Sequence, residues 1–210
     1  MPELCIPDST ERDDLGAFVA RAVRLDSEAI VRLRARAGRV DAWVASPFDT
    51  LVTRRVAGTV LPADLTVGGR DLLTALAVVG GAVVDPGRAQ DARWRCELPP
   101  EQGWHEVEQV PADVLSDLAD RGAAVVRDNP GPRGTPPVGL LDQKVITVSG
   151  AGFDVRVPLR CLLALSGMGF LGAHRPTDTV RVSATDSWLR LDARYGAVLR
   201  RRYALLPLLV

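Results

Sequence analysis

The order of elements within residues 152–203 is the feature that most constrains how this chain can fold. A short strand pattern at 153–157 precedes an apolar helix pattern at 159–171. Three further runs alternate apolar and polar residues, at 179–184, 188–193 and 197–203. Strict alternation is typical of strands with one buried face, whereas apolar residues spaced three and four apart are typical of a helix. The segment therefore predicts one strand, one helix and then three strands.

The same order recurs near the start of the chain. A strand pattern at 3–6 and a helix pattern at 11–24 precede three runs, at 29–36, 39–45 and 50–57. We interpret this recurrence as an internal repeat of two βαβββ modules. Two such modules can join their antiparallel sheets and bury the helices on one face. The predicted fold class is therefore α+β, with two pseudo-repeated modules.

The residues between the modules follow a less regular pattern. They predict a hairpin of 92–98 with 104–110, and then a helix that opens at 111–113 and ends near Gly122. Seven of the ten residues in 130–139 are Pro or Gly, which is typical of a mobile loop or linker. The expected organisation is an N-terminal module at 1–59, an inserted helix and hairpin region at 60–139 with a linker at 128–139, and a C-terminal module at 140–210. A degraded third module is the alternative to an insertion.

Charge is balanced over the whole chain but not along it. With 26 basic and 26 acidic residues, no bulk attraction to nucleic acid or to an anionic membrane is implied. Residues 28–58 carry six Arg against three acids, and residues 179–206 carry six Arg against two. Residues 85–128 carry five Arg against ten acids. We expect this acidic region to neutralise the arginine-rich strands; a basic groove for an external anion is the alternative.

Arginines at the ends of the predicted strands form the candidate interaction surface. Arginine suits such a surface because its planar fork grips a carboxylate or a phosphate with two hydrogen bonds. The surface also includes a tryptophan, which can anchor an interface. Its residues are Arg54, Arg55, Trp188, Arg190, Arg200 and Arg202. Because neighbouring strand residues face opposite sides, Arg200 and Arg202 are expected on one face and Arg201 on the other.

Chemical motifs predict no catalytic residue, no metal and no cofactor. Glycines 167, 169 and 172 have the spacing of a dinucleotide-binding loop, which lies between a strand and the start of a helix. Here they lie at the C-terminal end of a predicted helix, where glycine is common. His105 and Glu106 lack the second histidine of a zinc protease, and His174 has no second ligand at matching spacing. Catalysis by residues brought together from distant segments is the remaining enzymatic possibility.

Three widely separated cysteines, Cys5, Cys96 and Cys161, predict buried thiols in a reducing cytoplasm. The first residues lack the pattern of a signal peptide. The longest uncharged runs have 13 residues, whereas a membrane-spanning helix needs about 20. We therefore expect a cytoplasmic protein with no membrane partner.

The segment from Gly152 to Arg202 resembles a βαβββ half-domain of the DNA sliding clamps in element order and spacing, and residues 3–57 resemble a second copy. The resemblance implies a clamp-like body. Clamp helices line a channel with positive charge facing DNA. Here the first helix carries three acids beside three arginines, and the second carries Arg160 alone. The resemblance therefore does not extend to encirclement of DNA.

The function predicted from the sequence is that of a non-enzymatic interaction or structural protein. We expect it to form a homo-oligomer and to bind protein. One alternative is an enzyme or ligand-binding protein with a site between the modules. A second alternative is a clamp-like protein associated with nucleic acid.

Overall fold

A computed structural model describes residues 1–78, 81–131, 136–172, 175 and 177–202. The chain divides into two compact units. The first unit contains Met1–Glu97 together with Gly167–Gly169, and the second contains the rest of the chain. Each unit holds one of the two predicted modules.

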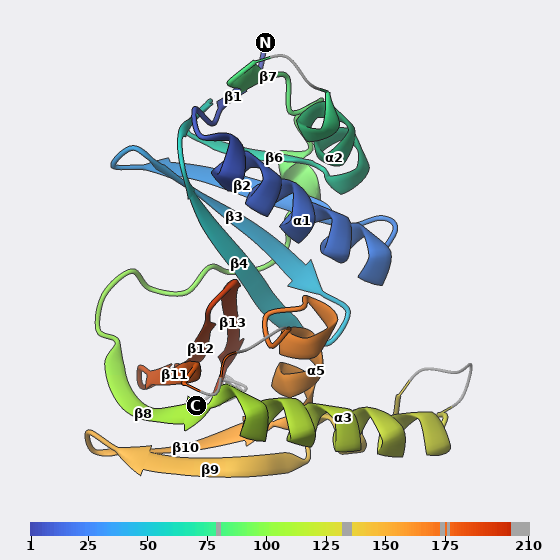
Figure 1. Cartoon of the computed structure of the whole chain (residues 1–210), viewed down its shortest axis with the longest axis vertical. Helices are drawn as coiled ribbons and strands as arrows, with labels where there is room; N and C mark the ends of the chain where they lie inside the picture. Colours follow the sequence, from blue (N-terminus) through green and yellow to red (C-terminus); the bar gives the residue numbers. More distant parts are fainter. Residues whose placement is uncertain (79–80, 132–135, 173–174, 176, 203–210) are drawn as a thin grey trace, which may run out of the picture. The chain divides into compact units, whose positions relative to one another are not determined.

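The first unit begins with the predicted strand, helix and three strands (Figure 1). Its elements are β1 (Glu3–Cys5), α1 (Ser9–Leu25), β2 (Ile30–Arg36), β3 (Arg39–Ser46), β4 (Thr50–Ala57), β5 (Thr59–Leu61), β6 (Asp64–Gly68), α2 (Gly69–Ala77), β7 (Val83–Val84) and the short helix η1 (Asp91–Arg93). Strands β6, β2, β3 and β4 pair in this order, and every pair is antiparallel. A small second sheet has the order β5-β1-β7.

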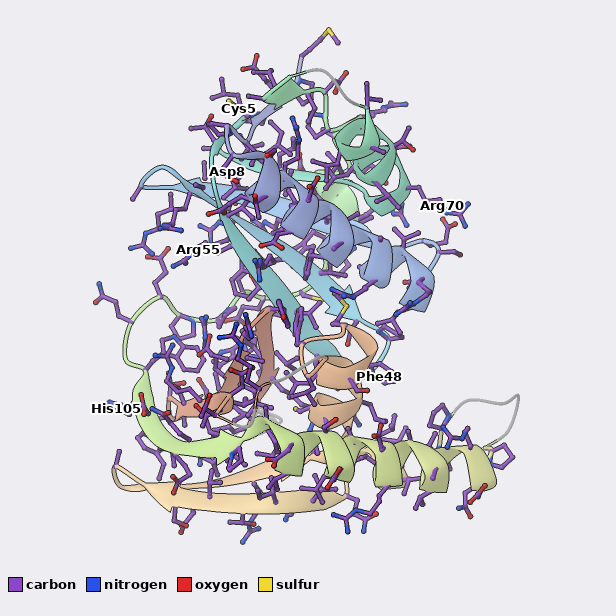
Figure 2. All side chains as sticks on the ribbon, in the orientation of Figure 1. Cys5, Asp8, Phe48, Arg55, Arg70 and His105 are labelled. Carbon is purple, nitrogen blue, oxygen red and sulfur yellow. The ribbon has the colours of Figure 1, made fainter. Side chains whose placement is uncertain are left out.

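Local sequence explains where α1 begins and which side it buries. The Asp8 side chain caps the helix by accepting a hydrogen bond of 3.0 Å from the backbone N–H of Glu11 (Figure 2). The buried side chains of the helix recur at helical spacing, and they are Leu15, Phe18, Val19 and Ala22. An ion pair between Asp14 and Arg54 of β4 ties the helix to the sheet. Capping and amphipathic spacing together fix α1 against one face of the sheet.

The second unit contains the C-terminal module. Its elements are β8 (His105–Pro111), α3 (Ala112–Asp128), α4 (Val138–Leu141), β9 (Lys144–Gly150), β10 (Phe153–Pro158), α5 (Leu159–Gly167), β11 (Thr179–Ala184), β12 (Trp188–Ala193) and β13 (Gly196–Arg201). Strands β13, β12, β11 and β8 pair in this order, again antiparallel. Strands β9 and β10 form a separate hairpin. Every residue of α5 from Leu159 to Leu165 is buried, so this helix is the core of the unit.

The strand–helix–three-strand order is therefore confirmed in both modules, as is the α+β class with antiparallel sheets. Glycines do lie at the C-terminus of α5, as predicted. The helix ends at Gly167, and Gly169 just beyond it has φ +66°. The predicted last strand is observed as β13, and only its final predicted residue, Tyr203, lies outside the described residues. The histidine His174 and residues 132–135 of the predicted linker also lie outside them.

The predicted hairpin of 92–98 with 104–110 is wrong. Residues 94–98 have no strand structure, and β8 pairs with β11, which lies about seventy residues later in the chain. The Asp91 carboxylate accepts a hydrogen bond of 2.6 Å from the backbone N–H of Thr66, which holds the earlier segment against β6. Alternation identified a strand at β8, but it carries no information about the partner of that strand.

The predicted end of α3 near Gly122 is also wrong, because the helix continues to Asp128. A Cβ atom at Gly122 would lie 2.1 Å from Cδ1 of Leu159 in α5. This glycine therefore permits close contact between two helices, and it does not act as a helix terminator.

The middle of the chain contributes strands to both modules. Strand β6 pairs with β2 of the first module, and β8 pairs with β11 of the second. Along the sequence, the first unit gives way to the second between Glu97 and Leu98. The predicted division into a module at 1–59, an inserted region at 60–139 and a module at 140–210 stays a prediction.

Candidate functional site

The arginine pairs at the strand ends occupy matching positions in the two modules. Arg54 and Arg55 are the fifth and sixth residues of β4, and Arg200 and Arg201 are the fifth and sixth residues of β13. In both modules the first arginine of the pair binds a carboxylate. Arg54 pairs with Asp14, and Arg200 approaches the Asp142 carboxylate to 3.0 Å.

The second arginine of each pair lies on the opposite side of its strand. Arg55 donates a hydrogen bond of 2.9 Å to Asp41 of the neighbouring strand β3. The Arg201 guanidinium lies 5.2 Å from the ring centroid of Trp188 on the neighbouring strand β12. The repeat therefore extends to the side chains, although the two modules use different partners for the second arginine.

A groove of about 480 Å³ lies in the second unit beside the end of β13. We call it the basic groove. Its lining residues are Asp142, Lys144, Asp154, Arg156, Pro158, Leu189, Arg200, Arg201 and Arg202. Five of these side chains are cationic and two are carboxylates, which gives a net charge of three positive units. Its volume lies within the range of small-molecule sites, about 300–1,000 Å³.

Alternation along β10 positions one wall of the basic groove. Val155 and Val157 are buried at 0% and 1% exposure, so Asp154 and Arg156 point to the other side of the strand. Lys144 begins the paired strand β9, opposite Pro158. Lys144 and Arg156 are both exposed, and within the described part of the chain neither makes an ion pair. These two cations are directed at solvent inside the groove.

Asp142 pairs with two arginines beside the basic groove. Its carboxylate accepts a hydrogen bond of 2.9 Å from Nε of Arg160, and it lies 3.0 Å from Arg200. Arg160 is only 4% exposed, and a buried guanidinium needs such a partner. Asp142 thus balances a buried charge of α5 and holds Arg200 at the groove wall.

Arg202 joins the basic groove to a pair of aromatic rings. It donates hydrogen bonds of 2.9 Å to the backbone carbonyls of Thr185 and Asp154. Its guanidinium lies 5.3 Å from the ring centroid of Phe153. The rings of Phe153 and His105 are 5.5 Å apart and inclined at 31°. His105 is exposed on the edge strand β8 (Figure 2), so the outer ring of the pair is open to solvent.

The predicted surface residues are divided between the two units. Arg200 and Arg202 line the basic groove, whereas Arg54 and Arg55 belong to the first unit. Trp188 is buried at 5% exposure. The remaining residue, Arg190, is half-buried: its Nε donates to Asp192 at 2.8 Å, and its guanidinium lies 5.9 Å from the ring of Trp104. Whether these arginines serve as a contact surface remains a prediction.

Carboxylates within each unit already pair with several of the strand-end arginines. The partners described above are Asp14, Asp41 and Asp142. All three lie outside the acidic region 85–128. The expected neutralisation of the arginine-rich strands by the acidic region 85–128 stays a prediction. It concerns contacts that these arginines make in addition to the ion pairs named here.

Sequence reasoning missed Lys144, Asp142 and the wall formed by Asp154 and Arg156. The signal for the wall was present, because charged residues alternate with buried valines in β10. Strand β9 was not anticipated, and the sequence does not indicate that the β9–β10 hairpin lies beside the end of β13.

Two features bear on metal binding and thiol chemistry in the described residues. No group of three or more His, Cys, Asp or Glu among them is placed to hold a metal ion. Burial raises the pKa of the Cys96 thiol, which disfavours the thiolate nucleophile at neutral pH. Within the described part of the chain, no helix is both long and apolar enough to cross a membrane.

Solved structures of DNA polymerase III β sliding clamps match nearly the whole chain. The pol III β of Caulobacter crescentus matches with a TM-score of 0.60 and 12% identity, over 98% of this chain and 66% of the clamp. The Bacillus subtilis clamp gives a TM-score of 0.60 and 15% identity over 97% and 65%. The β subunit of Thermotoga maritima gives 0.54 and 12% over 99% and 66%.

The chain therefore spans slightly less than two thirds of the length of these clamps. Such low identity shows the fold alone. The resemblance to sliding clamps expected from residues 3–57 and 152–203 is confirmed at that level, and it extends beyond those two segments.

Family profiles divide the chain at nearly the same point as the two structural units. Residues 1–96 match the Domain of unknown function DUF8010, and residues 99–205 match the Domain of unknown function DUF8185. No protein with a curated function matches the sequence. The second profile covers just over half of the 210 residues. The chain belongs to the family described as Domain of unknown function DUF8185.

Proposed function

We propose that this protein is a non-enzymatic interaction protein with a clamp-like fold, and that it binds an anionic partner through the basic groove. The net charge of the groove is the observation that carries the proposal. Lys144 and Arg156 place charge on one wall without an ion pair among the described residues. Burial of α5 and pairing of Asp142 support a preformed groove, which reduces the ordering cost of binding.

The helices argue against the clamp mode of DNA binding. Helix α1 carries three acids and three arginines, and α3 carries four aspartates and two arginines. Helix α5 carries Arg160 alone, and that residue is buried. A helix-lined channel around duplex DNA requires a positive inner face, because phosphate contacts supply most of the non-specific affinity. In this proposal the positive surface that matters lies beside the strands.

Self-association and a cytoplasmic location complete the proposal. A homo-oligomer is consistent with the likeness to sliding clamps. Cys5, Cys96 and Cys161 are free thiols, which is the usual state in a reducing compartment. Of the three thiols predicted to be buried, Cys161 is buried, whereas Cys5 and Cys96 are half-buried.

Generic polyanions test the proposed groove. We expect the protein to bind heparin and poly-glutamate with an affinity that falls as salt rises. The double variant Lys144→Ala, Arg156→Ala should weaken both interactions in isothermal titration calorimetry. The matched control is Arg121→Ala, Arg127→Ala, which removes the same charge from the exposed part of α3. Equal loss in both double variants, or no binding by the parent, would overturn the proposal.

A further inference from the structure

We infer that the basic groove binds a single strand of nucleic acid, with phosphates on the cations of β9, β10 and β13 and a base on the His105–Phe153 pair. The inference rests on the proposed function, and it names the chemical class of the anionic partner. It joins two features that lie side by side: the groove and the aromatic pair, which Arg202 connects.

The first step concerns the phosphate backbone. Cations from separate elements line the groove. Lys144 lies on β9 and Arg156 on β10, Arg200 and Arg201 end β13, and Arg202 follows directly. Successive cations along a groove suit a ligand that carries regularly spaced negative charges. Guanidinium groups also match phosphate oxygens in geometry. The net charge of three positive units remains after both carboxylates are counted.

The second step concerns the bases. Unstacked bases pack on aromatic rings and on arginine planes in proteins that bind single strands. Here Arg202, Phe153 and His105 form a continuous series, with separations of 5.3 Å and 5.5 Å. His105 is exposed and forms the outer end of this series. A base that leaves the backbone near Arg202 can stack there.

The same features favour a single strand over two other polyanions. Bases of a duplex are stacked inside the helix and are not available to His105. A groove of about 480 Å³ also has the size of a small-molecule site, so it suits a few nucleotides of one strand. An acidic peptide could pair with the cations, but its carboxylates would make no use of the aromatic pair.

Fluorescence anisotropy with a labelled oligothymidylate tests the inference on the full chain. We expect binding whose affinity falls with salt. The double variant Lys144→Ala, Arg156→Ala should reduce the slope of log affinity against log salt by about 1.4, because each phosphate contact with a single strand contributes about 0.7. His105→Ala should weaken binding about fivefold or more, since stacking on one ring is typically worth that much.

Controls separate this inference from the proposed function. His105→Ala should leave the affinity for poly-glutamate unchanged, and Arg121→Ala, Arg127→Ala should bind oligothymidylate like the parent. Thermal melting of each variant checks that it is folded. Binding of poly-glutamate but not of oligothymidylate would overturn the inference and leave the proposed function intact. The inference would also be overturned if His105→Ala left the affinity for oligothymidylate unchanged, or if the α3 control lost as much affinity as Lys144→Ala, Arg156→Ala. Failure to bind either polyanion would overturn both.

Discussion

Arg200 and Arg202 show how a single residue can serve the fold and a site together. Arg200 pairs with Asp142, and Arg202 donates to two backbone carbonyls. Both side chains nevertheless line the basic groove. We expect their internal contacts to contribute to stability whether or not the groove is occupied.

The double variant Arg200→Ala, Arg202→Ala should lower the free energy of unfolding by about 1–3 kcal/mol. Most of this loss is expected from the carbonyls of Thr185 and Asp154, which lose their donor Arg202. Asp142 loses Arg200 but keeps its hydrogen bond from Arg160, so its contribution should be small. Urea denaturation measures the change. The control is Arg121→Ala, Arg127→Ala, which removes equal charge from the surface of α3. A double variant as stable as the parent would show that these arginines do not support the fold.

Asp64 gives the first unit a pH dependence. The hydrogen bond from Arg32, at 2.7 Å, lowers the pKa of the Asp64 carboxyl below its ordinary value of 3.8. A carboxyl with a depressed pKa in the folded state contributes stability above its unfolded pKa, and this contribution is lost as pH falls through the folded value. Asp64→Asn should therefore be less stable than the parent at pH 7, and the difference should shrink below about pH 4.

Urea midpoints of parent and Asp64→Asn, measured at neutral and acidic pH, test this dependence. The control should be an exposed carboxylate without a structural role, which rules out Asp26, because its side chain accepts a hydrogen bond from the Glu28 backbone. Asp13→Asn on the exposed side of α1 is the better one. If the difference in stability between parent and Asp64→Asn stayed constant with pH, the lowered pKa of Asp64 would not be the source of the pH dependence.

At the scale of elements, the long helices α1 and α3 each contain an internal glycine, and the two glycines have contrasting surroundings. A Cβ atom at Gly16 of α1 would have nothing within 4 Å. A Cβ atom at Gly122 of α3 would lie 2.1 Å from the buried side chain of Leu159. The intrinsic preference for alanine over glycine in a helix is the same at both positions, about 1 kcal/mol.

Gly16→Ala should therefore stabilise the protein by about 0.5–1 kcal/mol. Gly122→Ala should lose this gain and destabilise, because overpacking costs about 1–3 kcal/mol. Each variant serves as the control for the other in thermal or urea unfolding. Equal stabilisation by both would show that Leu159 moves aside without cost.

At the scale of the whole molecule, the proposed homo-oligomer has a direct test. The chain has a mass of 22.5 kDa. Sedimentation velocity over a range of protein concentrations should reveal a species heavier than one chain. A single 22.5 kDa species throughout that range would contradict the proposed self-association and leave the groove proposals unaffected.

The sequence alone determined the order of elements in both modules. Alternation in β2 and β11 and helical spacing in α1 are local properties, because each depends on residues only a few positions apart. Since both modules repeat this order, the clamp-like fold could be expected from sequence despite identities of 12–15% to the clamps described above.

Tertiary structure alone decided which distant segments meet. The partner of β8, the contact of Gly122 with Leu159 and the approach of the β9–β10 hairpin to Arg200 all join residues far apart in the chain. Local patterns carry no information about such contacts, because strand pairing and helix packing depend on chain path and shape complementarity. The arginines of the candidate site were therefore recognisable from sequence, but the groove that collects some of them was not.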